Sequence, residues 1–226
     1  MGFDELKKWN IMQRFRMLVR GPKNLIDYWI KHQQILYHNP DMVMYFPVAL
    51  QYDDINAIKI GKVLVGSFCE ICVLAKSDYS NTPGQLIIED HTIIGSHANI
   101  RATGGKIYIG KNTLIAQQVS LIASNHSISN EQPYYNSPWD ESKTGVFIDE
   151  NVWIGAGVTV LPGCSIGKNS IIGAGSVVTK SIPANEIWVG VPAIKLRDID
   201  SSEGLRHLKT QSINSSVGDQ VIRRSS

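Results

Sequence analysis

His126 is the side chain whose type and place in the sequence best suit proton transfer. It lies in the segment IASNHSISN, directly before residues 127–147, which are rich in turn-forming residues and are predicted to form a loop. An imidazole with an ordinary pKa near about 6.5 can accept a proton at neutral pH, so it suits the role of general base toward a hydroxyl group. The plainer alternative is a solvated surface histidine, and the residue alone leaves both open.

The cysteines indicate packing rather than chemistry. Cys69 and Cys72 form a lone CxxC pair, and the chain has three cysteines in all. A zinc site would need a second pair or nearby histidines. We therefore expect small buried side chains, in a protein that fits a reducing compartment.

The elements that must position His126 follow a period of six. An aliphatic residue returns at this interval without a miss, at Ile148, Ile154, Val160, Ile166, Ile172 and Val178. A helix has a period of 3.6 and a strand a period of 2, so neither explains it. Six-residue repeats are typical of parallel β-helices, in which three repeats make one triangular coil. The aliphatic residue points into the prism, and a small residue lets the chain turn at the corner.

The same rhythm continues upstream in broken form. Ile88, Ile94 and Ile100 keep the interval, but the next repeat residue, Ile109, comes nine positions later. The insertion TGGK at 103–106 shifts the phase. We predict a β-helix domain that continues across this break and carries the loop as a projection.

Three regions follow from this pattern. We predict a helical and irregular extension at residues 1–58, the β-helix domain at 59–197 with its loop at 127–147, and a polar, flexible tail at 198–226. Within the extension, a first helix is expected to end at Gly21-Pro22 and a second at Asn39-Pro40.

Composition excludes several classes of protein. Lys and Arg number 22 against 20 Asp and Glu, and no basic stripe marks the body of the chain, so we expect no nucleic-acid partner. The longest apolar run, MVMYFPVAL, is far short of the roughly 20 residues that span a bilayer. The N-terminus carries acids and lacks a secretory signal, which favours a cytoplasmic location.

The segment NVWIGAGVTVLPGCSIGKNSIIGAGSVVTKSIPANEIWVGVPAIKLR, residues 151–197, resembles the hexapeptide-repeat acyltransferases. It is most similar to the maltose/galactoside-type and polysaccharide O-acetyltransferases, and the resemblance covers about 88–197. It implies an all-β, left-handed parallel β-helix and a homotrimer with active sites between subunits. It also implies direct transfer from acetyl-coenzyme A to a sugar hydroxyl, without an acyl-enzyme, in surface-polysaccharide biosynthesis.

The resemblance also implies roles for particular residues. His126 falls on the position of the catalytic base. The donor-site positions, which contact coenzyme A in the family, correspond here to Trp153, Ala156, Ala174, Thr179, Lys180 and Arg197. Alanines leave room for the pantetheine arm, and the two cations can meet phosphates. For Trp153, packing at the prism edge stays open as the alternative.

The acceptor contacts are less defined. His97 and Asn99 lie near the position of a sugar-binding asparagine in the family. The phase break at 103–106 makes the alignment ambiguous, so structural roles stay open for both.

Other functions of the same fold are also compatible with the sequence. Serine acetyltransferases, antibiotic O-acetyltransferases and nucleotide-sugar N-acetyltransferases share the fold and donor, and a non-enzymatic scaffold shares the repeat. The γ-type carbonic anhydrases hold zinc with three histidines. Here His91 and His97 lie six residues apart, hence on different faces of one coil, so we predict no metal site.

Residues 1–22 suggest a further partner. They form a basic amphipathic pattern with Phe3, Trp9 and Phe15 on the apolar side. This side is expected to pack on the prism or a neighbouring subunit. The alternative is peripheral contact with the inner face of an anionic membrane, which would suit a lipid-linked saccharide acceptor.

Overall fold

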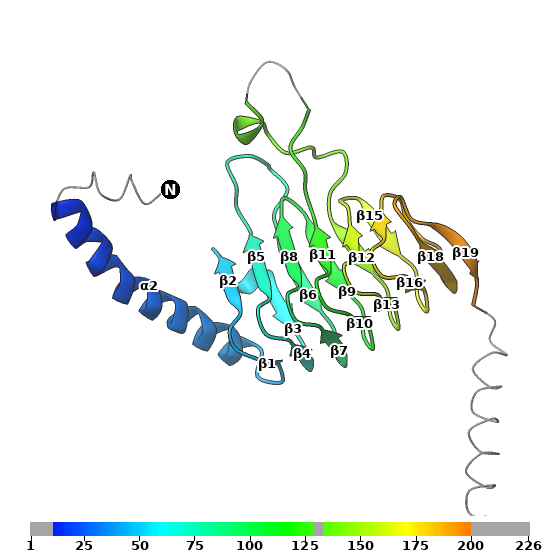
Figure 1. Cartoon of the computed structure of the whole chain (residues 1–226), viewed down its shortest axis with the longest axis horizontal. Coiled ribbons are helices and arrows are strands. Elements are labelled where there is room, and N and C mark those ends of the chain that lie inside the picture. The colour runs from blue at the N-terminus through cyan, green and yellow to red at the C-terminus, as the bar shows by residue number, and fades with distance from the viewer. Residues whose placement is uncertain (1–10, 129–132, 200–226) are drawn as a thin grey trace, which may run out of the picture.

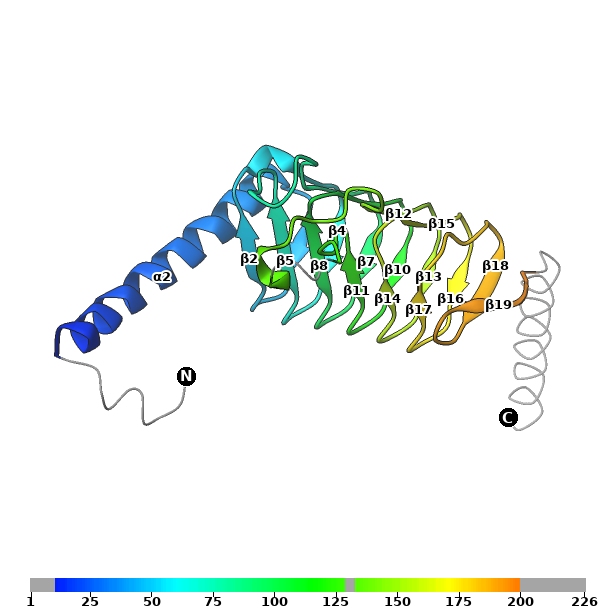
Figure 2. The ribbon, with the colours of Figure 1, turned by 90° about the horizontal axis from the view of Figure 1, so that it is seen from above.

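The computed structural model describes residues 11–128 and 133–199 of the 226-residue chain. The chain winds into a three-sided prism whose sides are three sheets, with a long helix at one end (Figures 1 and 2). Each circuit adds one short strand to each sheet, so most neighbours within a sheet are three strands apart in the chain.

The three sheets are named A, B and C. Sheet A, as described, contains β1 (Val43–Met44), β4 (Val63–Val65), β7 (Thr92–Ile94), β10 (Leu114–Ile115), β13 (Trp153–Ile154), β16 (Ile171–Ile172), β18 (Glu186–Val189) and β19 (Ile194–Asp198). Sheet B contains β2 (Ala49–Tyr52), β5 (Glu70–Leu74), β8 (Asn99–Thr103), β11 (Ser120–Ile122), β14 (Thr159–Val160) and β17 (Val177–Val178). Sheet C contains β3 (Ile58–Ile60), β6 (Gln85–Ile88), β9 (Lys106–Ile109), β12 (Val146–Ile148) and β15 (Cys164–Ile166). The pairings are parallel until β19 folds back antiparallel on β18.

The period of six fills the prism. All six aliphatic residues of the clean repeat are at most 1% exposed, and the cysteines are buried. Successive coils stack at the strand spacing of about 4.8 Å, so each buries the face of the next. The predicted parallel β-helix of hexapeptide repeats is therefore confirmed, and the architecture fits the left-handed winding that the resemblance implies.

Two corners of the prism are built from stacked residues in the left-handed backbone region. At the corner between sheets A and B these are Phe68, His97, Gln118, Gly157 and Gly175. At the corner between C and A they are His91, Asn112, Asn151, Asn169 and Asn185. The backbone N–H of each donates to the preceding coil, and the amides of the last three asparagines join in a ladder of 2.9 Å hydrogen bonds. These corners leave little freedom for insertions.

The third corner, between sheets B and C, accommodates the long connections. There the phase break places Gly104 at φ +60°, and a Cβ added to it would run into the Trp139 ring. Gly105 similarly lies against the backbone of Gly145. The TGGK insertion therefore makes room for the loop that leaves after β11 and returns at β12. Its last residues, Val146 and Phe147, already belong to β12.

The N-terminal helix differs from the prediction. A single helix, α2 (Ile11–His38), runs through Gly21-Pro22, so the predicted stop there is wrong. Proline removes one backbone donor, but its φ is compatible with a helix, so the chain can continue. The second predicted stop is confirmed: Asn39 follows the last turn, its side chain donates to Ile35 O at 2.8 Å, and it accepts from Ile60 N–H at 2.7 Å.

The sheets begin earlier than the predicted domain boundary at residue 59. Strands β1 and β2 pair in register with β4 and β5. Two 3-10 turns, Ile55–Ala57 and Tyr134–Asn136, complete the described elements. Residues 1–10, most of the predicted tail and the loop tip at 129–132 lie outside the described part of the chain.

Gly104→Ala should destabilise the protein more than Gly175→Ala. Both positions have left-handed φ, which costs alanine about 1–2 kcal/mol. Gly175 has no atom within 4 Å of an added Cβ, whereas Gly104 has the Trp139 ring. We expect an extra loss of at least about 1 kcal/mol for Gly104→Ala in urea unfolding. Equal losses would contradict the packing of Trp139 on this glycine.

Candidate active site

His126 stands where the chain leaves the prism at the corner between sheets B and C. The two ends of its loop pair with each other: Ser127 N–H donates to Pro138 O at 2.8 Å, and Asp140 N–H to Asn125 O at 2.9 Å. His126 and Trp139 form an antiparallel bridge between them. The histidine is thus held on a hydrogen-bonded hairpin stem rather than on a free loop.

The tautomer of His126 follows from its hydrogen bond to the opposite strand of the stem. Nδ1 lies 2.8 Å from the backbone oxygen of Ser137. A carbonyl oxygen can only accept, so Nδ1 carries the proton and donates it. In the neutral ring Nε2 then keeps its lone pair. The side chain is exposed, so this lone pair is accessible to an acceptor molecule.

A second segment braces the stem from the connection between β5 and β6 (Figure 1). Trp139 N–H donates to Tyr79 O at 2.8 Å. One carboxylate oxygen of Glu141 accepts from Ser80 Oγ at 2.8 Å and from Asn81 N–H at 2.6 Å. The hydrogen bond from Ser80, followed by that from Asn81, holds the pKa of Glu141 below its usual value. The carboxylate that clamps the two segments together, here called the Glu141 clamp, is therefore charged at neutral pH.

Two aromatic rings lie edge-on to the imidazole. The His126 ring centroid lies 6.1 Å from that of Tyr79 and 6.4 Å from that of Trp139. Tyr79 and Trp139 are themselves nearly parallel, with an interplanar angle of 21°. The sequence reasoning missed both residues. Trp139 could have been noticed as the tryptophan of the predicted loop, but nothing in the sequence pairs Tyr79 with it.

The predicted donor alanines lie at a different corner. Ala156 and Ala174 stack at the corner between sheets A and B, where Gly175 N–H donates to Ala156 O at 2.8 Å. His97 occupies the same corner two coils earlier and stacks on Phe68 at 5.2 Å. Asn99 follows on sheet B, and its buried Oδ1 has no hydrogen-bond partner among the described residues.

The remaining predicted residues lie either at the corner of His126 or on sheet A. Thr179 and Lys180 follow β17 at the corner of His126, and Lys180 lies 5.2 Å over the Trp188 ring. Trp153 and Arg197 lie on sheet A, where Trp153 is 50% exposed. Sheet B therefore separates His126 from Ala156 and Ala174 within one chain.

Sheet A carries a continuous apolar stripe. Residues in direct register on seven strands point outward, namely Val43, Leu64, Ile93, Leu114, Trp153, Ile171 and Ile187. Four of them are at least 42% exposed. In the matching row of sheet B the four central residues, Glu70, Asn99, Ser120 and Thr159, are polar, and the sheet carries the ion pair Arg101–Glu70 at 2.9 Å. A long apolar stripe on one side of a prism marks a contact surface.

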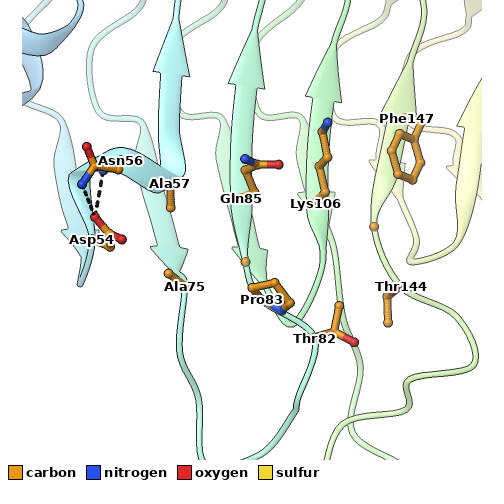
Figure 3. Close-up of a pocket in the computed structure, with 12 residues that line it drawn as sticks. Asp54, Asn56, Ala57, Ala75, Thr82, Pro83, Gln85, Lys106, Thr144 and Phe147 are labelled. Atoms are coloured by element: carbon orange, nitrogen blue, oxygen red, sulfur yellow. Dashed lines mark hydrogen bonds between the residues drawn. The ribbon is translucent and has the colours of Figure 1, made fainter.

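A groove of about 450 Å³ runs along sheet C at the base of the loop (Figure 3). Its wall combines Ala57, Ala75, Pro83 and Phe147 with the polar ends of Gln85 and Lys106. The residues predicted for the active site do not line it. In residues 11–128 and 133–199 there is no group of three His, Cys, Asp or Glu that could hold a metal, and no helix long and apolar enough to cross a membrane.

Comparison with known proteins identifies the family. The model "Bacterial transferase hexapeptide (six repeats)" matches residues 145–180. Galactoside O-acetyltransferase of Lactococcus lactis subsp. lactis (strain IL1403) is 35% identical over 145 residues, which cover 63% of this chain and 67% of the relative. WbbJ of Escherichia coli (strain K12), provisionally named a lipopolysaccharide biosynthesis O-acetyl transferase, is 38% identical over 49% of this chain and 59% of its own.

The same architecture occurs in AntD, an N-acyltransferase from Bacillus cereus solved with dTDP and 3-hydroxybutyryl-CoA. The TM-score is 0.60 at 20% identity, over 79% of this chain and 89% of AntD, which shows a shared fold. The chain belongs to the hexapeptide-repeat acyltransferase family. The predictions of an acyltransferase, with acetyl-coenzyme A as co-substrate, are confirmed.

Proposed function

We propose that the protein transfers an acetyl group from acetyl-coenzyme A to a sugar hydroxyl, in the synthesis of a surface polysaccharide. The observation that carries the chemistry is the hydrogen bond from His126 Nδ1 to Ser137 O, which leaves Nε2 as a base. The acceptor class rests on the names of the galactoside and lipopolysaccharide relatives.

The proposed reaction is a single displacement at the thioester. As the sugar hydroxyl oxygen attacks the carbonyl carbon, His126 Nε2 takes its proton. The tetrahedral intermediate then collapses, the C–S bond breaks, and the imidazolium returns the proton to the leaving thiolate. The products are the acetyl ester and coenzyme A. The Ser137 carbonyl stabilises the imidazolium between these two proton transfers.

The site is completed in this proposal by a neighbouring subunit. His126 and the corner alanines lie on opposite sides of sheet B, so a donor that touches both is best explained by two chains. The apolar stripe on sheet A supports a homotrimer in which Trp153 and Arg197 border the cleft between subunits. Thr179 and Lys180 would then meet the coenzyme from the His126 side. His97 and Asn99, at the corner between sheets A and B, stay proposed as acceptor contacts that a neighbouring subunit would bring to the cleft.

His126→Ala should lower turnover by at least about 10²-fold, because a general base contributes on this scale. The measurement is thiol release from acetyl-coenzyme A with a panel of sugars and sugar nucleotides. His38→Ala is the control, since His38 is an exposed histidine at the end of α2. Near-wild-type turnover in His126→Ala would remove the mechanism. Thiol release with nucleotide-linked amino sugars or antibiotics instead would reassign the acceptor.

Leu114→Glu should convert the proposed trimer to monomers at low micromolar concentration. It places a charge in the middle of the apolar stripe, which costs several kcal/mol if that stripe is buried between subunits. Gln85→Glu on the exposed face of sheet C is the control. Light scattering coupled to size-exclusion chromatography gives the mass. An unchanged mass in Leu114→Glu would show that this stripe is not the contact.

We also propose that α2 contacts an anionic membrane. The helix begins at Ile11, so its first turns fall within the predicted membrane-binding segment, residues 1–22. Helix α2 carries five basic residues and one acidic residue, Asp27. Its described part exposes Leu25, Ile26, Trp29 and Ile30, each by at least 41%. In Figures 1 and 2 the helix extends away from the prism as an arm. A basic helix with exposed apolar and aromatic side chains suits an anionic surface.

Vesicle co-sedimentation tests this contact. The full chain should sediment with phosphatidylglycerol vesicles and much less with phosphatidylcholine vesicles, because the basic charge adds about 1 kcal/mol per residue at an anionic surface. A chain that begins at residue 23 keeps the exposed apolar residues but loses Arg14, Arg16 and Arg20, so it should lose most of this charge-dependent binding. Equal sedimentation of the two chains would refute the proposal.

A further inference from the structure

A second cavity lies directly beside the proposed base. Segments 77–81 and 138–141 line an open pocket of about 460 Å³, together with Ser127, the residue after His126. Pockets that take small molecules begin at about 300 Å³. The pocket is preformed, because the Trp139–Tyr79 backbone bond and the Glu141 clamp join its two walls.

The walls of this pocket combine aromatic rings with hydrogen-bond acceptors. Tyr79 and Trp139 line it, and the same two rings contact the His126 imidazole edge-on. Aromatic faces attract the weakly positive C–H groups of a sugar ring. Asp78, Asp140 and Glu141 add carboxylate oxygens that accept from hydroxyl or amino groups. This is the composition that a saccharide needs from its site.

The charged side chains that line the pocket are all acidic. Its lining contains three carboxylates and, among the described residues, no Lys, Arg or His. Hydrogen bonds from Ser142 hold the pKa of Asp140 below its usual value, as those from Ser80 and Asn81 do for Glu141, so both are ionised at neutral pH. An anionic sugar would be repelled at this site, whereas an amino sugar would gain an ionic contact.

We propose that this pocket is the acceptor site and that it selects neutral or amino-bearing saccharides against acidic ones such as uronic acids. The inference rests on the proposed function and names its substrate class. A sugar ring lies against Tyr79 and Trp139, its hydroxyl or amino groups bind the carboxylates, and the accepting hydroxyl is presented to Nε2 of His126.

Binding is measured without acetyl-coenzyme A, by saturation-transfer NMR on the full-length protein. The probes are methyl β-galactoside, methyl glucosaminide and methyl glucuronide. The wild type should bind the first two at least about tenfold more tightly than the glucuronide. Tyr79→Ala keeps the backbone bond to Trp139 and should weaken binding of the neutral probe by about tenfold. Trp139→Ala is less informative, because it also removes the packing on Gly104.

A charge reversal tests the selectivity. Asp78→Lys should raise glucuronide affinity by about tenfold, whereas Asp41→Lys, an equal charge change on an exposed residue outside the pocket, should not. Equal binding of glucuronide and galactoside by the wild type would overturn the proposal. So would an unchanged affinity in Tyr79→Ala, or no binding of any probe.

A second arm separates this inference from the proposed function. Thiol release from acetyl-coenzyme A is measured with the same probes and variants. If acceptor binding depends on Tyr79 but no probe gives thiol release, the acceptor pocket is supported and the acetyl transfer is refuted. If thiol release occurs and its acceptor KM is unchanged in Tyr79→Ala and Asp78→Lys, the acetyl transfer is supported and the acceptor pocket is refuted.

Discussion

The backbone hydrogen bonds between coils constrain everything else in this structure. Each short strand gives its N–H and C=O groups to the coils before and after it, so a strand cannot accept an inserted residue without breaking both pairings. Insertions are therefore restricted to corners. Two of the three corners are further fixed by ladders of left-handed residues. The corner between sheets B and C is where the chain departs from the prism, and His126 lies there.

This constraint also explains how a loop residue such as His126 is held in one place. The stem of the His126 loop is tied by backbone hydrogen bonds, braced by the segment around Tyr79, and seated by the Trp139 ring on Gly104. The prism thus supplies rigidity, and the loop carries the proposed base.

The sequence predicted the prism because its period of six is a direct consequence of three-sided coiling. The same rhythm located the phase break at 103–106 and the loop after it. The structural role of the phase break could not be predicted, because the contact between Gly104 and Trp139 joins residues far apart in the chain. The start of the sheets was missed because β1 and β2 lack the repeat pattern. The predicted helix end at Gly21-Pro22 was wrong because proline can be accommodated within a helix.

The predicted site is divided by the structure in a way that no spacing argument could foresee. Ala156 and Ala174 fall at one corner and His126 at another, with sheet B between them. Residue types alone therefore indicated which side chains could bind or react, but not how these side chains are arranged in space. One aromatic partner of His126, Tyr79, comes from a connection between β5 and β6 that carries no repeat signal at all.

The Ser137 carbonyl fixes His126 with its proton on Nδ1 and its lone pair on Nε2. Two-dimensional ¹H–¹⁵N NMR of protein with ¹⁵N-labelled histidine measures this tautomer directly at a pH where the ring is neutral, with His126→Gln used for assignment. We predict a protonated Nδ1 and an unprotonated Nε2 at His126. A proton on Nε2, or two tautomers in rapid exchange, would contradict the account.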